Sequence, residues 1–133
     1  MSMSDPVADF LTRLRNATMR RHATVECDSS KIKVELASIL KKEGFIEEFR
    51  GFKNDRGHQR MEVKLKYDRD GNSVIRGMRR VSTPGLRRHQ GYRELRPVYS
   101  GQGIAIVTTS SGVLTDFDCR ERKIGGEVIC HVW

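Results

Sequence analysis

The 133-residue chain has few of the residues on which several classes of protein depend. It has three cysteines, one tryptophan and three prolines, and aromatic residues make up 7% of it. Cys27, Cys119 and Cys130 are odd in number and lack the paired spacing of a zinc site. We therefore expect no disulfide framework and no metal, and interpret the cysteines as reduced thiols of a cytoplasmic protein. The low aromatic content argues against a wide cofactor pocket, and we expect no cofactor.

Long hydrophobic runs are also missing. No apolar stretch approaches the length of a membrane-spanning helix, so we expect no membrane association. The opening MSMSDPVADF lacks the basic region and apolar stretch of a signal peptide. Hydrophobic residues nevertheless make up 37% of the chain and are spread along it, which is enough to form a core.

Acidic residues are scarce relative to basic ones. The chain has 17 Asp and Glu against 25 Lys and Arg, a formal charge of +8. Such an excess favours a polyanionic partner, with nucleic acid ahead of an anionic membrane. Between Arg69 and Arg96 the basic residues are all arginine, whose guanidinium group matches the geometry of a phosphate.

The first half of the chain has the pattern of a small helix-on-sheet lobe. Apolar residues at helical spacing predict a helix over 7–17, with Ser4 or Asp5 as its cap and Pro6 in its first turn. We then expect a strand, a second helix that ends at Gly44, and a hairpin whose second strand alternates strictly. Their ranges are 23–27, 28–44, and 45–52 with 60–67, the last two joined by a turn at 54–57.

The second half has the pattern of strands with little helix. A polar junction at 68–72 separates the two halves, and Pro84-Gly85 predicts a turn. We expect strands over 73–81, 103–109 and 127–133, and one or two helical turns over 115–123. The predicted fold class is α+β with two small lobes: residues 1–67 form an N-terminal α-β-α-β-β lobe, and residues 68–133 form a mainly antiparallel β lobe with a short helix.

The motifs of enzymes are incomplete. Gly101-Gln102-Gly103 lacks the third glycine of a dinucleotide-binding loop, and Ser110-Ser111 lacks the G-x-S-x-G setting of a hydrolase. Acidic residues that might suggest magnesium alternate with basic ones, which favours ion pairs instead; they are Asp116, Asp118, Glu121 and Glu127. We expect no enzyme, although a hydrolase that uses Ser110 or Ser111 stays open as an alternative.

Two features favour nucleic acid. Thr108, Thr109, Ser110 and Ser111 end a β-branched strand just before Gly112, and hydroxyls of this size can approach a ribose 2′-OH, a phosphate or a base edge. The alternative is an ordinary loop in which Thr115 caps the next helical turn. The Pro84-Gly85 bend also holds arginine pairs on both of its sides. A DNA-binding regulator is a second alternative, but it should have a helix-turn-helix, and here a strand is expected after the first helix.

Several motifs together resemble the bacterial ribosomal protein S8 family, the eighth protein of the small subunit. They are DPVADFLTRLRNA (5–17), SSK (29–31), KKEGFI (41–46), RVSTPGLR (80–87), GIAIVTTSSGVLTD (103–116) and GGEVIC (125–130). The resemblance implies a primary 16S rRNA-binding protein that binds the central domain, helps to assemble the platform and contacts proteins five and twelve. It also implies a cytoplasmic monomer within the ribosome and, in several bacteria, a repressor of its own operon mRNA.

The resemblance places RNA contacts mainly in the C-terminal lobe. Thr108, Thr109 and Ser110 match the family's Ser-Thr-Ser loop, and Glu127 matches a glutamate beside it. The full set of expected RNA-binding residues is Thr108, Thr109, Ser110, Ser111, Gly112, Glu127, Arg80, Pro84, Gly85, Arg87, His89, Ser30 and Lys31. Three residues depart from the family pattern: Thr108 replaces serine, His89 replaces tyrosine, and Cys119 replaces alanine or glycine.

Overall fold

The computed structural model describes residues 5–133, which form two compact units. The N-terminal unit is Pro6–Ile75, and the C-terminal unit contains Asp5 and Arg76–Trp133. The polar stretch 68–72 is a turn inside the N-terminal unit, because the Asp68 amide donates to the Asn72 carbonyl at 2.8 Å and the Val74 amide donates to the Lys66 carbonyl at 3.1 Å. The chain therefore leaves this unit only after Ile75. Ser4, one of the two expected caps, lies outside the described residues.

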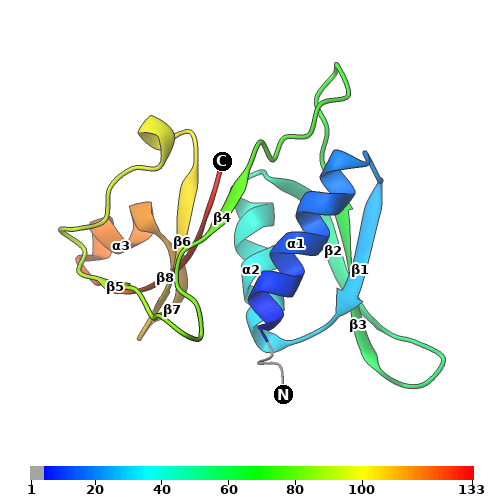
Figure 1. Cartoon of the computed structure of the whole chain (residues 1–133), viewed down its shortest axis with the longest axis horizontal. Helices are drawn as coiled ribbons and strands as arrows, with labels where there is room; N and C mark the ends of the chain where they lie inside the picture. The colour runs from blue at the N-terminus through cyan, green and yellow to red at the C-terminus, as the bar shows by residue number, and fades with distance from the viewer. Residues whose placement is uncertain (1–4) are drawn as a thin grey trace. The chain divides into compact units, whose positions relative to one another are not determined.

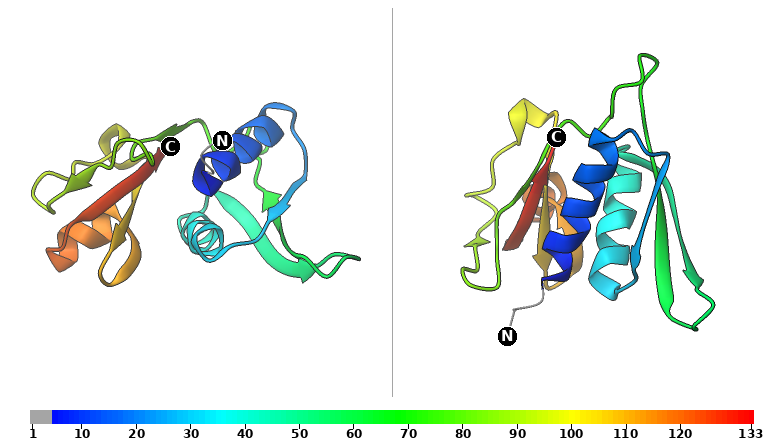
Figure 2. Two further views of the ribbon diagram at one scale, coloured as in Figure 1. Left: turned by 60° about the horizontal axis from the view of Figure 1, so that its bottom comes forward. Right: turned by 45° about the vertical axis from the view of Figure 1, so that its right-hand side comes forward.

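The N-terminal unit is a three-stranded antiparallel sheet with two helices side by side on one face (Figures 1 and 2). Its elements are α1 (Pro6–Met19), β1 (Thr24–Asp28), α2 (Lys31–Lys42), β2 (Ile46–Lys53) and β3 (Gln59–Leu65), with β3 in the centre of the sheet. The apolar stripe of α1 is buried, as is the alternate set Met61, Val63 and Leu65 on β3. The expected α-β-α-β-β order is confirmed, and Gly44 follows α2 with φ +82°.

The C-terminal unit is an antiparallel sheet with one short helix. The strand order is β4-β8-β6-β7, and β5 also pairs with β8, so β8 and β6 form the centre (Figure 1). The elements are β4 (Met78–Arg80), β5 (His89–Gln90), the 3₁₀ turn η1 (Tyr99–Gly101), β6 (Ile104–Thr109), β7 (Gly112–Thr115), α3 (Asp116–Arg122) and β8 (Gly126–Val132). The α+β class and the strand-rich C-terminal part are as expected.

The expected strand over 73–81 is wrong over most of its length, because only Met78–Arg80 forms β4. Ser73 bridges to Tyr67 within the N-terminal unit. The amides of Arg76 and Gly77 both donate to the Trp133 carbonyl, at 2.6 and 2.9 Å. The residues before β4 are therefore bonded to two different partners instead of following one strand.

None of the helices within residues 5–133 is both long enough and apolar enough to span a membrane.

Candidate nucleic-acid interface

Three neighbouring strands bring residues that are far apart in sequence into one row across the C-terminal sheet. His89 on β5 lies opposite Glu127 on β8, and Glu127 lies opposite Thr108 on β6. Residues directly opposite each other in antiparallel strands are about 5 Å apart and share a face of the sheet. Three of the expected RNA-binding residues are therefore close neighbours.

The hydroxyl hairpin, which we define as residues 108–112, is a tight connection between β6 and β7. Thr109 and Gly112 are paired, so Ser110 and Ser111 form a two-residue turn. Gly112 has φ +101°, a conformation that favours glycine. The Thr109 hydroxyl donates to the Gly112 carbonyl at 2.7 Å and accepts from the Ser111 amide at 3.0 Å. The tip is thus fixed by its own hydrogen bonds.

The four hydroxyls of this hairpin differ in accessibility. Ser110 and Ser111 are exposed, and within residues 5–133 their hydroxyls make no hydrogen bond. The Thr109 hydroxyl is committed to the turn, and the Thr108 Oγ1 is buried without a hydrogen-bond partner among the described residues. Gly126 allows this close packing, because a Cβ atom there would collide with the Thr108 carbonyl oxygen. Two of the four hydroxyls are therefore free for a ligand.

Glu127 is held by donors from the chain itself. Its Oε2 accepts from the Ser82 hydroxyl at 2.5 Å and from the Arg87 guanidinium at 3.0 Å, and 19% of its side chain is exposed. Burial alone raises the pKa of Glu127, but the hydrogen bonds from Ser82 and Arg87, with the charges of Arg87 and His89, outweigh it and leave the pKa below its ordinary value. Glu127 is therefore an anion at neutral pH that orients its neighbours.

Ser82 is a site residue that the sequence pattern did not indicate. It is completely buried, and its hydroxyl also accepts from the Arg88 amide at 3.1 Å. Arg80 donates through Nε to the Ser82 carbonyl and pairs with Asp5 at 3.5 Å, with 15% of its side chain exposed. The Arg80 guanidinium is thus engaged mainly with other residues of the chain. A small polar residue before Thr-Pro-Gly carries no sequence signal of burial, which explains why Ser82 was missed.

The proline-glycine turn, which we define as residues 83–88, projects beside Glu127. Thr83 and Leu86 close it, since the Thr83 amide donates to the Leu86 carbonyl at 3.0 Å and the Leu86 amide donates back at 3.1 Å. The expected turn at Pro84-Gly85 is confirmed. Arg87 and Arg88 at the end of this segment, and His89 directly after it, are exposed. This places cationic and imidazole side chains next to the row that ends in the hydroxyl hairpin.

Ser30 and Lys31 belong to the N-terminal unit. Ser30 is the N-cap of α2, where its hydroxyl accepts from the Lys33 amide at 3.3 Å, and Lys31 is exposed in the first turn. The Ser30 side chain therefore has a structural partner already, while the Lys31 ammonium group is accessible.

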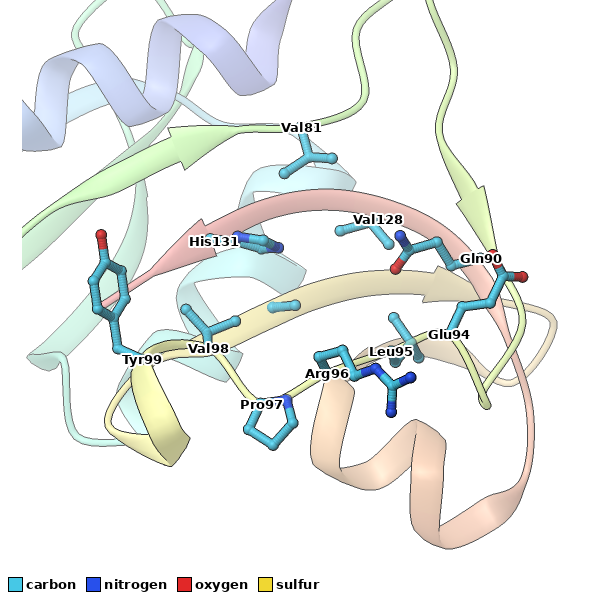
Figure 3. Close-up of a pocket in the computed structure, with 11 residues that line it drawn as sticks. Val81, Gln90, Glu94, Leu95, Arg96, Pro97, Val98, Tyr99, Val128 and His131 are labelled. Atoms are coloured by element: carbon cyan, nitrogen blue, oxygen red, sulfur yellow. The ribbon is translucent and has the colours of Figure 1, made fainter.

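A groove of about 360 Å³ lies between the segment 94–99 and residues of β5, β6 and β8, with Val81, the residue after β4, also in its lining (Figure 3). Its floor is apolar, with Val81, Val98 and Val128, and its polar groups include Glu94 and His131. Burial is the main cause that lowers the pKa of His131, and the charge of Arg79 adds to it, so the imidazole is neutral at pH 7. The residues that line the groove include no serine or cysteine that could act as a nucleophile.

Comparison with known proteins shows to which family the chain belongs. A family model described as ribosomal protein S8 matches residues 5–133. A small ribosomal subunit protein uS8 from Leuconostoc mesenteroides is 52% identical over all 133 residues of both chains. The uS8 proteins of Limosilactobacillus reuteri and Lactobacillus helveticus are 51% and 47% identical, again over the full length of both chains. The chain belongs to the ribosomal protein S8 family.

As an S8-family member the chain is a structural, non-enzymatic constituent of the small ribosomal subunit, cytoplasmic in a bacterial ribosome, and its partners are rRNA and ribosomal proteins. The resemblance seen in the motifs is therefore confirmed.

The geometry also disfavours the two alternatives. His131 on β8 lies opposite Ala105 on β6. Ser110 is five residues beyond Ala105, which places it about 16 Å along the strand from the position opposite His131, at roughly 3.3 Å per residue. Within residues 5–133 no hydrogen bond joins Ser110 or Ser111 to a histidine, as a serine hydrolase would need. After α1 the S8-family chain continues into β1 instead of a second helix, so no helix-turn-helix begins there.

Proposed function

We propose that this S8-family chain binds the central domain of 16S rRNA directly, as a primary binding protein that helps to assemble the platform. The contact surface is the hydroxyl hairpin together with the proline-glycine turn and His89. The observation that carries the proposal is the pair of free hydroxyls on Ser110 and Ser111, at the tip of a hairpin fixed by its own hydrogen bonds.

A rigid tip with small hydroxyls suits a folded RNA surface. Ser110 and Ser111 can donate to and accept from a ribose 2′-OH or a base edge without the length of a lysine or arginine side chain. The hairpin is held before binding, so little conformational entropy is lost when RNA is contacted. The S8 fold would thus use this edge to recognise RNA shape and sugar hydroxyls.

Arginines of the same unit supply the electrostatic attraction. Arg79 and Arg88 are exposed, and Arg87 is half exposed while it pairs with Glu127. Cations that neutralise phosphates release condensed counterions, which makes affinity fall steeply with salt. Arg88 is best suited to phosphate contact, because its main chain is bonded to the sheet while its side chain is exposed. Arg80 would act from beneath the surface by holding Ser82.

We propose three further contacts of the chain. Lys31, beside the Ser30 cap of α2, offers a second phosphate contact from the N-terminal unit. Proteins five and twelve of the small subunit are the proposed protein neighbours, and the chain's own operon mRNA is a proposed second RNA ligand of the same hydroxyl hairpin. These assignments come from the family resemblance.

Chemical footprinting of 16S rRNA with and without the protein tests the binding site. We expect protection confined to the central domain, and an unchanged footprint would contradict the proposal.

A Ser110→Trp variant tests whether the hydroxyl hairpin is the contact surface. We expect its affinity in filter binding to fall more than tenfold at an unchanged free energy of unfolding, since the indole would hold the RNA off the hairpin. Gln102→Trp, exposed at the opposite end of β6, is the matched control and should bind like the wild type.

A further inference from the structure

We propose that Ser82 is a positioning residue of this interface: its buried hydroxyl joins the Glu127 carboxylate to the main chain of Arg88 and so fixes the proline-glycine turn beside the hydroxyl hairpin. The inference rests on the proposed rRNA binding and deepens it. Ser82 itself does not touch RNA, because it is completely buried.

Every polar group of Ser82 has a partner. Its amide donates to the Val128 carbonyl at 3.0 Å, and its carbonyl accepts from Arg80 Nε. Its hydroxyl donates to Glu127 at 2.5 Å and accepts from the Arg88 amide at 3.1 Å. A hydroxyl is suited to this place, because it is a small group that donates and accepts at the same time.

These bonds define how the proline-glycine turn is anchored. Arg88 is fixed through both of its main-chain groups, by the bond from its amide to Ser82 and by the bond from the Val128 amide to its carbonyl at 2.9 Å. Thr83 and Leu86 close the turn upon itself but do not bond it to the sheet. The Ser82 hydroxyl is therefore the second of two ties between the end of the turn and β8, beside the main-chain bond from Val128, and it is the one that also reaches Glu127.

Removal of the Ser82 hydroxyl should release both partners. The Glu127 carboxylate would keep the Arg87 guanidinium as its donor, and that side chain is 53% exposed and free to move toward solvent. The Arg88 amide would lose its acceptor in a partly buried place, which favours a local opening of the turn. The pKa of Glu127 should rise, since the hydrogen bond from Ser82 is among the causes that lower it.

The test compares Ser82→Ala with Thr115→Ala in the full-length chain. Thr115 is buried in the same unit, and its hydroxyl accepts from the Asp118 amide at 3.1 Å as the cap of α3, so its loss also destabilises the unit but not the turn. We expect Ser82→Ala to bind a 16S rRNA central-domain fragment about tenfold more weakly, and Thr115→Ala to bind like the wild type when both are measured well below their unfolding temperatures. Ser82→Cys, which keeps a weak donor, should recover part of the affinity.

Two measurements on the free protein distinguish positioning from general destabilisation. In Ser82→Ala, but not in Thr115→Ala, NMR titration should give a higher pKa for Glu127, and hydrogen exchange of the Arg88 amide should be faster. Equal affinities for Ser82→Ala and the wild type, or equal losses in both alanine variants, would overturn the inference. If the wild type itself fails to bind the fragment, the proposed function falls, and this inference falls with it before any variant is compared.

Discussion

Glu127→Gln replaces a charged acceptor by a neutral one of the same shape. The carboxylate accepts two hydrogen bonds, from Ser82 at 2.5 Å and from Arg87 at 3.0 Å. A hydrogen bond to a charged group is worth about 1.5–3 kcal/mol net, and a neutral one about half as much. The amide oxygen keeps the bond from Ser82, and the bond from Arg87 counts for less because that side chain is 53% exposed. We expect a loss of about 1–1.5 kcal/mol at pH 7.

The pH dependence of this loss makes the prediction specific. The pKa of Glu127 is lower in the folded protein than its ordinary value of 4.5. A carboxyl of this kind adds stability above its unfolded pKa, and the gain disappears as the pH falls through the folded pKa. The stability difference between wild type and Glu127→Gln should therefore be constant from pH 8 to 6 and should shrink steadily below pH 4.5.

Urea unfolding followed by tryptophan fluorescence measures this difference. Trp133 is the single tryptophan, lies in the C-terminal unit and has its ring 4.7 Å from that of Tyr99, so its emission reports the unfolding of this unit. Equal stabilities at pH 7, or a difference that stays the same down to pH 3, would refute the assigned role of the carboxylate.

Three further predictions concern the same unit. Asp116→Ala should lower the unfolding free energy by about 3 kcal/mol in the same assay, because the buried carboxylate accepts from the Ala105 amide at 3.0 Å and from Arg120 at 2.7 Å. Arg88→Gln should reduce the slope of log affinity against log salt by about one, as filter binding over a salt series will show, and an unchanged slope would mean that this side chain contacts no phosphate. Gly112→Ala should destabilise the hairpin by about 1 kcal/mol, measured by urea unfolding, since φ is +101° there.

The elements that could be predicted from sequence are those with a local pattern. The apolar stripe of α1, the alternation of Met61, Val63 and Leu65 in β3, and the glycine after α2 each reflect a period or a cap that a few neighbouring residues determine. The short strands β5 and β7 were missed, because two and four residues are too few to show a period and their conformation is set by pairing with β8 and β6.

In the candidate site, too, local features could be predicted from the sequence and features that depend on strand pairing could not. The hydroxyls of 108–111 stand together in the sequence and were found. That the Thr108 hydroxyl is buried while the Ser111 hydroxyl is free depends on strand register. The link between Ser82 and Glu127 spans 45 residues, and only the folded sheet brings them into contact. The positions of such links depend on tertiary packing, which a single sequence does not display.

Directed hydroxyl-radical probing from a position beside the hydroxyl hairpin tests the central claim most directly. Gln90→Cys, exposed on β5 next to His89 and outside the proposed contact surface, can be labelled selectively with an iron chelate, because the three native cysteines are buried. The labelled protein is first shown to retain binding and is then placed on 16S rRNA, with labelled Asp55→Cys, in the turn between β2 and β3, as the comparison. The account predicts strong cleavage of central-domain strands from position 90; binding without any cleavage from that position would contradict it.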